Sequence, residues 1–361
     1  MVKIISIVSG KGGCGKSLLT AVIGRALARE GERVLLIDTD IFVRGLTILL
    51  HSFKRKKTED NLINFSDILG INKVNSKDIE PVKFKKEDLN LSRFFECDVL
   101  PAVDSISAPL DYDDRDLSDE KFCTNQLKKV LNIVGNSYDY IMLDNRAGMD
   151  SLILASCKIS DFVISVAEDD PVGKQTNSNL VNHLKYNLKI KKVYTIINKG
   201  RNIKYYDDII SRSDIKSEFS EIGVIPFDIE ILQDFGTDRF WNTVNETLYF
   251  IAVLDAWNNL SNFENIKELS KSKYRFPPKI FMNKTQGKYT LIERIIRIYS
   301  ITFIFAGIFL WVYPRIISGK LTEFELFSIV SILVGVITLI ISTTNLRKFI
   351  IGDFTKFFKD K

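Results

Sequence analysis

A glycine-rich run close to the N-terminus contains the residue types that bind a triphosphate. Residues 8–18 read Val-Ser-Gly-Lys-Gly-Gly-Cys-Gly-Lys-Ser-Leu. Glycines allow backbone N–H groups to turn toward an anion, and a helix that follows adds the positive end of its dipole. In such a loop, a lysine lies along the β- and γ-phosphates and a hydroxyl ligates Mg²⁺. The spacing assigns these roles to Lys16 and Ser17 and predicts a magnesium-dependent nucleotide site.

Three aspartates follow apolar runs that are typical of buried strands. Asp38 and Asp40 end the run that begins at residue 33, and Asp144 ends the run that begins at residue 138. Ligands of open α/β sheets bind at the carboxyl ends of the strands. A carboxylate there can hold Mg²⁺ through water, which is the role predicted for Asp144. The alternative for Asp38 and Asp40 is that they only cap the next helix.

These side chains can meet only if strands and helices alternate along the chain. The apolar run 4–8 before the loop reads as a strand, and apolar residues recur at helical spacing over 18–27 after it. Strand, glycine loop and helix in this order are the context that a phosphate-binding loop requires. Further strands are predicted at 162–167, 193–198 and 222–225. The sequence therefore predicts an α/β fold with a mostly parallel, doubly wound sheet of the P-loop NTPase type.

A second lysine at the start of the loop, Lys11, indicates which class of P-loop protein this sequence resembles. The pattern Lys-Gly-Gly-x-Gly-Lys-Ser resembles the deviant Walker A box of the MinD/ParA family of ATPases, and the resemblance covers roughly residues 1–260. It implies ATP and Mg²⁺ as cofactors. It also implies an ATP-dependent homodimer in which Lys11 reaches the nucleotide of the partner subunit.

Carried over by position, the resemblance gives a full set of site residues. The implied catalytic residues are Lys11, Lys16 and Asp40, with Asp40 near the attacking water. The implied metal-binding residues are Ser17, Asp38, Asp40 and Asp144. Asn198 is the implied base-recognition residue, beside a loop at the adenine. The implied nucleotide-binding residues are Gly10, Lys11, Gly12, Gly13, Cys14, Gly15, Lys16, Ser17, Leu18, Asn198, Pro226 and Asp228.

One segment departs from the family pattern. Residues 145–148, Asn-Arg-Ala-Gly, resemble the switch segment Asp-x-Pro-Ala-Gly that follows the metal-binding strand, but Arg146 stands where that segment has proline. Proline fixes φ, so its loss is expected to loosen the switch. The rate of hydrolysis and its stimulation by a partner are therefore inferred less directly than nucleotide binding.

Two long apolar runs lie near the C-terminal end, at about 295–313 and 326–346; the second carries no charge, and the first carries only Arg297. Each is long enough to cross a bilayer as a helix, and basic residues on both outer sides predict cytoplasmic termini and a two-span protein of the inner membrane. Two buried core helices are the alternative. The predicted parts are an ATPase domain at 1–262, a basic linker at 263–290, a transmembrane hairpin within 291–346 and a basic amphipathic tail at 347–361.

Charge is distributed unevenly along the chain. The formal net charge is +5, yet residues 263–361 alone carry +9, which leaves −4 on residues 1–262. A protein that binds DNA without sequence specificity needs basic residues to neutralise the DNA phosphates. The predicted ATPase domain lacks that excess, so no nucleic-acid partner is expected, whereas anionic lipids would attract the C-terminal charges.

Together these features predict a membrane-anchored, ATP-dependent dimerisation switch that hydrolyses ATP and positions or regulates a membrane-associated protein partner. The alternatives are a nucleotide-gated membrane effector whose hairpin oligomerises, a ParA-like DNA-partitioning ATPase, a bacterial tyrosine kinase and a nucleotide-dead adaptor. The absence of tyrosine after Tyr313 argues against the kinase. The presence of Lys11, Lys16 and the aspartates argues against the adaptor.

Overall fold

The computed structural model describes residues 1–51, 62–69, 84–103, 117–201, 220–274 and 276, with a few isolated positions between 299 and 332. The chain divides into two compact units, Met1–Phe281 and Met282–Lys361. Nearly all described residues belong to the first unit. This unit ends at Phe281, whereas the predicted ATPase domain ends at residue 262.

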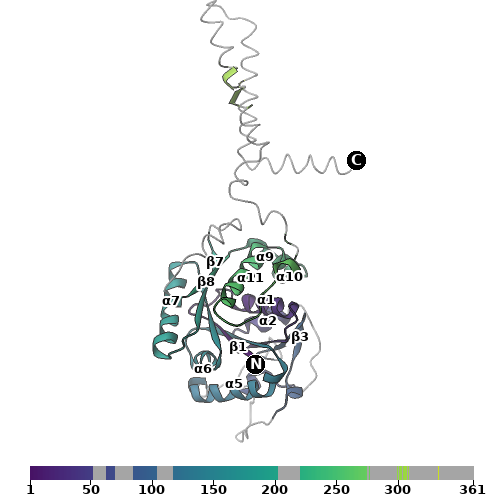
Figure 1. Ribbon diagram of the computed structural model, residues 1–361, viewed down its shortest axis with the longest axis vertical. Coiled ribbons are helices and arrows are strands. Elements are labelled where there is room, and N and C mark those ends of the chain that lie inside the picture. Colours follow the sequence, from purple (N-terminus) through teal and green to yellow (C-terminus); the bar gives the residue numbers. More distant parts are fainter. Residues whose placement is uncertain are drawn as a thin grey trace, which may run out of the picture. The chain divides into compact units, whose positions relative to one another are not determined.

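In the described part of the first unit, the core is a mostly parallel eight-stranded sheet with the order β3-β4-β2-β5-β1-β6-β7-β8 (Figure 1). Only β3 runs antiparallel to its neighbour, β4. This arrangement confirms the predicted α/β fold with a mostly parallel sheet. The strands are β1 (Lys3–Ser9), β2 (Val34–Asp38), β3 (Ser92–Phe94), β4 (Cys97–Leu100), β5 (Tyr140–Ala147), β6 (Phe162–Glu168), β7 (Val193–Gly200) and β8 (Glu221–Pro226).

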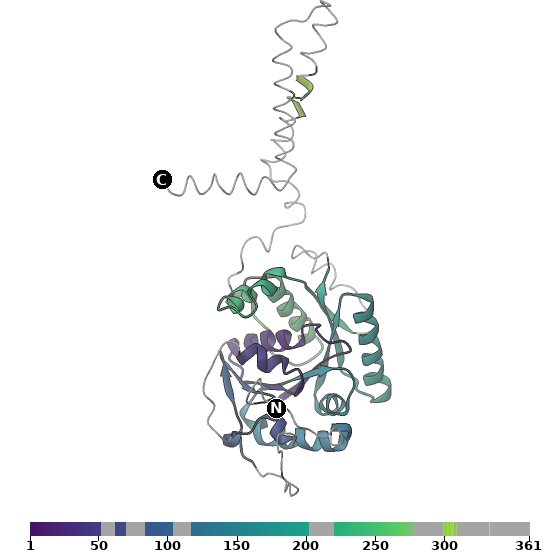
Figure 2. The ribbon, with the colours of Figure 1, turned by 180° about the vertical axis from the view of Figure 1, so that it is seen from behind.

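Helices cover both faces of the sheet, as Figures 1 and 2 show from opposite sides. Helices α1, α2, α10 and α11 pack on one face, and α3, α5, α6 and α7 pack on the other. The longer helices are α1 (Lys16–Arg29), α2 (Gly45–His51), α5 (Glu120–Val134), α6 (Ser151–Ile159), α7 (Pro171–Asn182) and α11 (Leu248–Ser261). The shorter ones are α3 (Phe65–Ile68), η1 (Lys86–Asp88), η2 (Gly135–Ser137), the single-turn π-helix η3 (His183–Asn187), α9 (Ile229–Asp234), α10 (Phe240–Asn245) and η4 (Lys271–Lys273).

Strand periodicity explains why both faces of the sheet must be covered. On β2, Leu36 packs into the core beneath α1, while its neighbours Leu35 and Ile37 pack into the core beneath α5. Successive side chains of a strand point to opposite faces, so a run that is apolar throughout needs a helix on each side. The continuous apolar runs of the sequence are therefore the direct cause of the doubly wound architecture.

The sequence around α5 determines where this helix begins and which of its faces is buried. The Asp119 side chain caps α5 by accepting a hydrogen bond from the backbone N–H of Lys121 at 2.8 Å. The buried residues of α5 recur at intervals of four, three and four, which places them on one helical face. They are Cys123, Leu127, Val130 and Val134.

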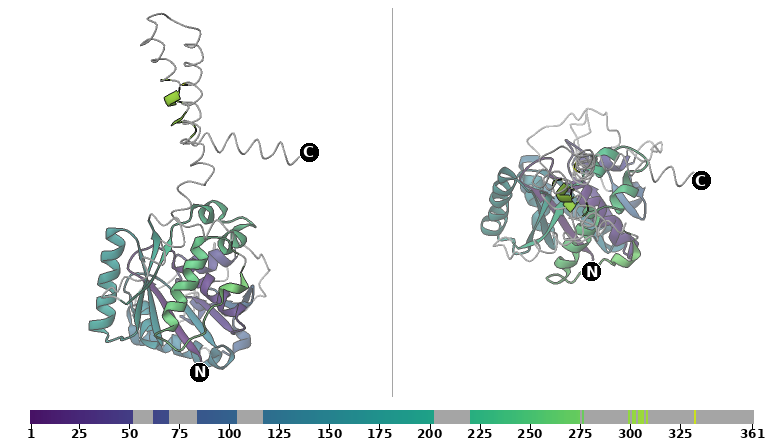
Figure 3. Two further views of the ribbon diagram at one scale, coloured as in Figure 1. Left: turned by 45° about the horizontal axis from the view of Figure 1, so that its top comes forward. Right: turned by 90° about the horizontal axis from the view of Figure 1, so that it is seen from above.

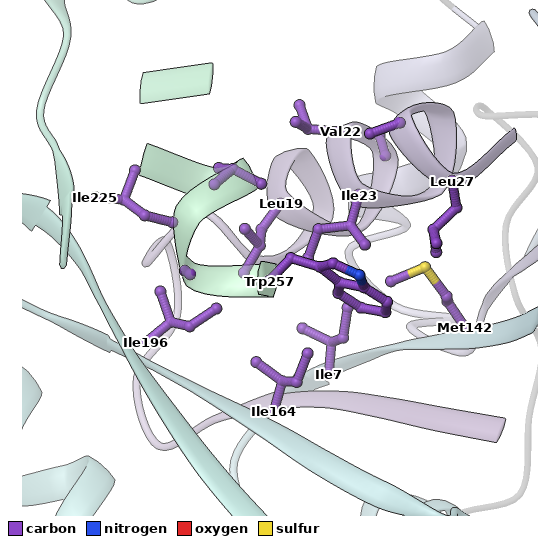
Figure 4. Close-up of a cluster of buried hydrophobic side chains, with 14 of the residues drawn as sticks. Ile7, Leu19, Val22, Ile23, Leu27, Met142, Ile164, Ile196, Ile225 and Trp257 are labelled. Atoms are coloured by element: carbon purple, nitrogen blue, oxygen red, sulfur yellow. The ribbon is translucent and has the colours of Figure 1, made fainter. Parts of the chain in front are cut away.

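Helix α11, green in Figure 3, packs against β8 and α1. Its Trp257 lies in the core between α1 and the sheet (Figure 4). Its ring lies above Ile7 and Ile164 of the sheet, it is 1% exposed, and its indole N–H donates to the Lys267 carbonyl at 2.8 Å. This bond links the residues that follow α11 to the core. Leu269, two residues further on, is also buried.

We expect Trp257→Ala to lower the free energy of unfolding by about 3–5 kcal/mol, because it leaves a large cavity in the core. The midpoint of urea unfolding measures this loss. Trp257→Phe is the matched control, since it keeps an aromatic ring and should lose clearly less. Equal midpoints for Trp257→Ala and the wild type would contradict the packing described here.

The structure contradicts the predicted location in the membrane. Among the described residues, no helix combines the length and the apolar character needed to cross a bilayer, so the two-span inner-membrane topology with cytoplasmic termini is not supported. The prediction rested on the near absence of charge in two runs, and composition alone does not establish a spanning helix. Most of the first run, nearly all of the second and the whole tail at 347–361 lie outside the described residues.

Candidate nucleotide-binding site

The glycine loop between β1 and α1 is closely packed and strongly curved. Gly13 and Gly15 have φ values of 75° and 90°, the left-handed region that favours glycine. A Cβ atom at Gly15 would overlap the Asn198 side chain, and one at Gly10 would overlap the Thr176 carbonyl of α7. The loop therefore needs glycine at these positions both for its backbone angles and for its close approach to β7 and α7.

Lys16 projects its ammonium group back across this loop. The side chain is buried, and Nζ donates a hydrogen bond to Ser9 Oγ at 2.8 Å. Ser9 Oγ in turn donates to the Lys11 carbonyl at 2.8 Å. A buried cation beside inward-facing N–H groups at a helix N-terminus favours the binding of a multiply charged anion. The geometry agrees with the phosphate-binding role predicted for Lys16.

Asp144 lies next to this anion site with one oxygen unused. Its Oδ1 accepts a hydrogen bond from Thr20 Oγ1 of α1 at 3.1 Å. Its Oδ2 is buried and has no hydrogen-bond partner among the described residues. Burial raises the pKa of Asp144, while the Ser17 hydroxyl and the Lys16 charge oppose that rise. A buried carboxylate oxygen without a partner is costly, so a cation that binds it would stabilise the site.

Asp38 and Asp40 approach Asp144 because β2 pairs with β5, with Asp38 directly beside Asp144. Asp38 Oδ2 accepts two hydrogen bonds from Thr47, from the backbone N–H and from the hydroxyl, both at 2.7 Å. Burial and the Asp144 charge raise the pKa of Asp38. Asp40 Oδ1 accepts from the Val43 N–H at 3.0 Å. Both aspartates thus accept backbone hydrogen bonds from the segment 43–47, which spans the start of α2.

The residues present fit Mg²⁺ bound together with a nucleotide. Within the described residues, no group of three or more His, Cys, Asp or Glu side chains is arranged to hold a metal ion alone. Nucleotide-associated Mg²⁺ usually takes one or two carboxylates and completes its shell with phosphate and water oxygens. Asp144 offers the free oxygen, and the Ser17 hydroxyl lies close to the start of α2, where a Cβ on Gly45 would approach it to 2.7 Å.

Asn198 supports the glycine loop. Its amide Nδ2 donates to the Cys14 carbonyl at 2.7 Å, and its Oδ1 accepts from the Lys199 N–H at 2.8 Å. Pro226 ends β8 beside β7, and the Asp228 side chain caps α9 by accepting from the Glu230 N–H at 2.9 Å. The structure thus gives Asn198 a supporting contact that the sequence did not indicate, and its part in base recognition stays a prediction.

The switch segment is held by side chains in place of the missing proline. Arg146 forms an ion pair with Asp150, and its guanidinium lies 4.5 Å from the centre of the Phe42 ring. The Gly148 N–H donates to the Ser9 carbonyl at 2.9 Å, which joins the switch to the glycine loop. The expected loosening at Arg146 is therefore opposed by these contacts.

A buried polar network behind the switch was missed at the sequence level. Asn145 Oδ1 accepts from Thr39 Oγ1 at 3.1 Å and from Ser156 Oγ at 2.7 Å. Its amide donates to the Ile7 and Leu143 carbonyls at 3.2 and 3.0 Å. The network links β1, β5 and the residue after β2 to α6. A polar residue directly after Asp144, the aspartate that follows an apolar run, was the available signal.

Lys11 is paired within its own subunit. Its Nζ lies 2.8 Å from Glu168 Oε2 and 3.0 Å from Asp170 Oδ2. The hydrogen bond to Glu168, followed by that to Asp170, raises the pKa of Lys11. Sequence reasoning missed both acids, although Glu168 ends β6 and Asp170 follows two residues later, at the same sheet edge as Asp38 and Asp144. The same rule about strand ends could have found them.

Known proteins resemble the chain in sequence and in fold. An AAA domain family model, AAA_31, matches residues 2–199, more than half of the chain. A putative septum site-determining protein MinD of Guillardia theta is 27% identical over 231 residues, which cover 63% of this chain and 76% of that protein. MinD of Pyrococcus horikoshii, solved as a complex with Mg-ADP, aligns with a TM-score of 0.52 at 22% identity and covers 73% of this chain and 97% of that one.

A third relative was solved with a partner. The MinC:MinD cell division protein complex of Aquifex aeolicus aligns with a TM-score of 0.51 at 22% identity and covers 74% of this chain and 98% of that chain. These structural likenesses concern the fold, and they agree with the parallel sheet and the loop described above. The chain belongs to the AAA domain family and is a P-loop ATPase that resembles MinD proteins in sequence and fold.

Proposed function

We propose that this protein is an ATP-dependent dimerisation switch. It binds ATP with Mg²⁺ in the glycine loop, two copies then associate through their nucleotide sites, and hydrolysis separates them. The observation that carries the proposal is the buried Lys16 ammonium near Asp144, whose Oδ2 has no hydrogen-bond partner among the described residues. One group suits phosphate and the other suits a cation.

The roles of the residues follow from their positions. Lys16 and the loop N–H groups would hold the β- and γ-phosphates, and Asp144 and the Ser17 hydroxyl would hold Mg²⁺. Bound Mg²⁺ supplies neutralisation of the charge that develops on the phosphates. Asp40, anchored by the Val43 N–H, would orient the attacking water. Asp38 would keep the Asp40 loop in place through Thr47.

The proposed dimer face is the edge of the sheet that carries the loop. Three exposed apolar side chains lie on the segments that follow β2, β5 and β6 at this edge: Val43, Met149 and Val172, which are 68%, 48% and 62% exposed. Lys11 lies at the same edge, on the loop after β1. Burial of these side chains against a second copy would favour association and would let Lys11 reach the other nucleotide.

The partner that reads the nucleotide state is proposed to be a protein. A MinD relative was solved in a complex with MinC, which shows a protein partner for that relative. Residues 1–262 of this chain carry a net charge of −4, which disfavours nonspecific binding to DNA phosphates. A protein partner therefore fits this chain better than a nucleic acid.

We expect Asp40→Asn to keep ATP binding and dimerisation while it lowers turnover about 100-fold or more, because the variant loses the carboxylate that orients the water. Phosphate release measures turnover, and sedimentation velocity with ATP measures dimerisation. The wild-type dimer should decay as ATP is consumed, whereas the variant dimer should persist. A wild-type protein that stays monomeric at saturating ATP and Mg²⁺ would refute the proposed function.

A further inference from the structure

We infer that Glu168 and Asp170, here called the acidic pair, are positioning residues that retain Lys11 in its own subunit and so determine how readily the dimer forms. The inference rests on the proposed function, in which Lys11 acts on the partner's nucleotide. In the free subunit the Lys11 ammonium contacts both carboxylates, at 2.8 and 3.0 Å. The same ammonium cannot also extend to a second copy.

The acidic pair is fixed, and Lys11 is the member that can move. Glu168 is the last residue of β6, and Asp170 caps α7 directly before Pro171. Their side chains are 20% and 12% exposed, whereas that of Lys11 is 37% exposed. Lysine also has a long flexible stem with a compact charge. A change of side-chain conformation at Lys11 is therefore enough to break the contact.

Release of Lys11 does not leave the acidic pair without partners. Glu168 Oε1 accepts a hydrogen bond from Lys199 Nζ at 3.2 Å, and Asp170 Oδ1 accepts from the Gly173 N–H at 2.8 Å. Each carboxylate keeps a donor after Lys11 has left. Because an unpaired, partly buried charge is costly, these second donors make the departure of Lys11 reversible at low cost.

Release also leaves the phosphate loop undisturbed. The Lys11 carbonyl accepts hydrogen bonds from Ser9 Oγ at 2.8 Å and from Cys14 Sγ at 3.3 Å, so the backbone is held independently of the side chain. The retention of Lys11 should therefore affect dimerisation but not the binding of ATP to a single subunit. This separation distinguishes a positioning role from a general structural role.

Glu168→Gln and Asp170→Asn test the inference, since both keep side-chain size and asparagine still caps a helix. Each should lower the dimer dissociation constant of the full chain about threefold to tenfold, measured by sedimentation with Mg²⁺ and a nonhydrolysable ATP analogue. The thermal midpoint and the ATP affinity of the single subunit should stay unchanged. Asp169→Asn is the matched control, because Asp169 pairs with Lys174 at the same turn, and it should change neither value.

A second measurement reads the contact without dimerisation. Acetylation of nucleotide-free protein by acetic anhydride, followed by mass spectrometry, should modify Lys11 more slowly in the wild type than in Glu168→Gln or Asp170→Asn. Equal rates at Lys11, or a dimer that is unchanged or weaker in both variants, would overturn the inference. A wild type that never dimerises refutes the proposed function instead, and the acetylation rates still decide whether the acidic pair holds Lys11.

Discussion

Replacing Lys16 with alanine should weaken ATP binding by about 100-fold or more. The ammonium group lies buried against the loop and donates to Ser9 Oγ at 2.8 Å, so it is already placed where phosphate oxygens would lie. A hydrogen bond from a charged donor to a phosphate contributes about 1.5–3 kcal/mol, and each 1.4 kcal/mol is a factor of ten in affinity. Loss of the positive charge removes the attraction to all the phosphate oxygens at once. Titration calorimetry with ATP and Mg²⁺ measures the change.

Lys174→Ala is the control for Lys16→Ala, because it also removes one lysine from the ATPase unit. Lys174 lies on α7 and pairs with Asp169 at 2.6 Å, so its loss should leave ATP affinity near the wild-type value. Circular dichroism verifies that both variants are folded. Wild-type ATP affinity in a folded Lys16→Ala protein would show that the glycine loop is not the nucleotide site.

Lys11→Ala should separate binding from turnover. The loop backbone at Lys11 is held by Ser9 and Cys14, so a single subunit should bind ATP nearly as well as the wild type. Turnover should fall about 1,000-fold, the scale of the effect when a cation supplied in trans is removed from a phosphoryl-transfer site. ATP-dependent dimerisation should be lost with it. Calorimetry, phosphate release and sedimentation measure the three quantities.

Lys11 and Lys16 lie five residues apart, yet the two alanine variants are expected to lose different properties. Lys16→Ala is expected to lose nucleotide affinity, whereas Lys11→Ala is expected to lose association of subunits. An equal loss of ATP affinity in both variants would mean that Lys11 serves its own nucleotide and would contradict its role in trans. Full turnover in Lys11→Ala would contradict it as well.

The sequence predicted those parts of the fold that local patterns specify. Apolar runs identified β1, β2 and β5 to β8, and the glycine loop between β1 and α1 was found where the structure has it. The edge strand β3 and its neighbour β4 were missed. They are three and four residues long, β3 contains Arg93, and their pairing gives no apolar run to detect. Short edge strands are specified by their neighbours more than by their own composition.

In the candidate site too, local sequence patterns predicted some residues and gave no sign of others. The sequence predicted Lys16, Ser17, Asp38, Asp40 and Asp144 as site residues because each lies within a motif or at the end of an apolar run. The supporting contact from Asn198 to the Cys14 carbonyl joins residues 184 positions apart, so no local pattern reveals it. The acidic pair was overlooked for another reason: an acid run after a strand also reads as the start of a solvated loop. The burial of each carboxylate and its distance from Lys11 distinguish a site residue from an exposed loop residue, and both are known only from the folded structure.

The central claim is that ATP and Mg²⁺ bound in the glycine loop bring two copies of this chain together. Sedimentation equilibrium of the full chain, with Mg²⁺ and either a nonhydrolysable ATP analogue or ADP, tests it most directly. We expect the molecular mass to double with the ATP analogue and to stay that of one chain with ADP. Saturated binding of the ATP analogue with no increase in mass would contradict the account.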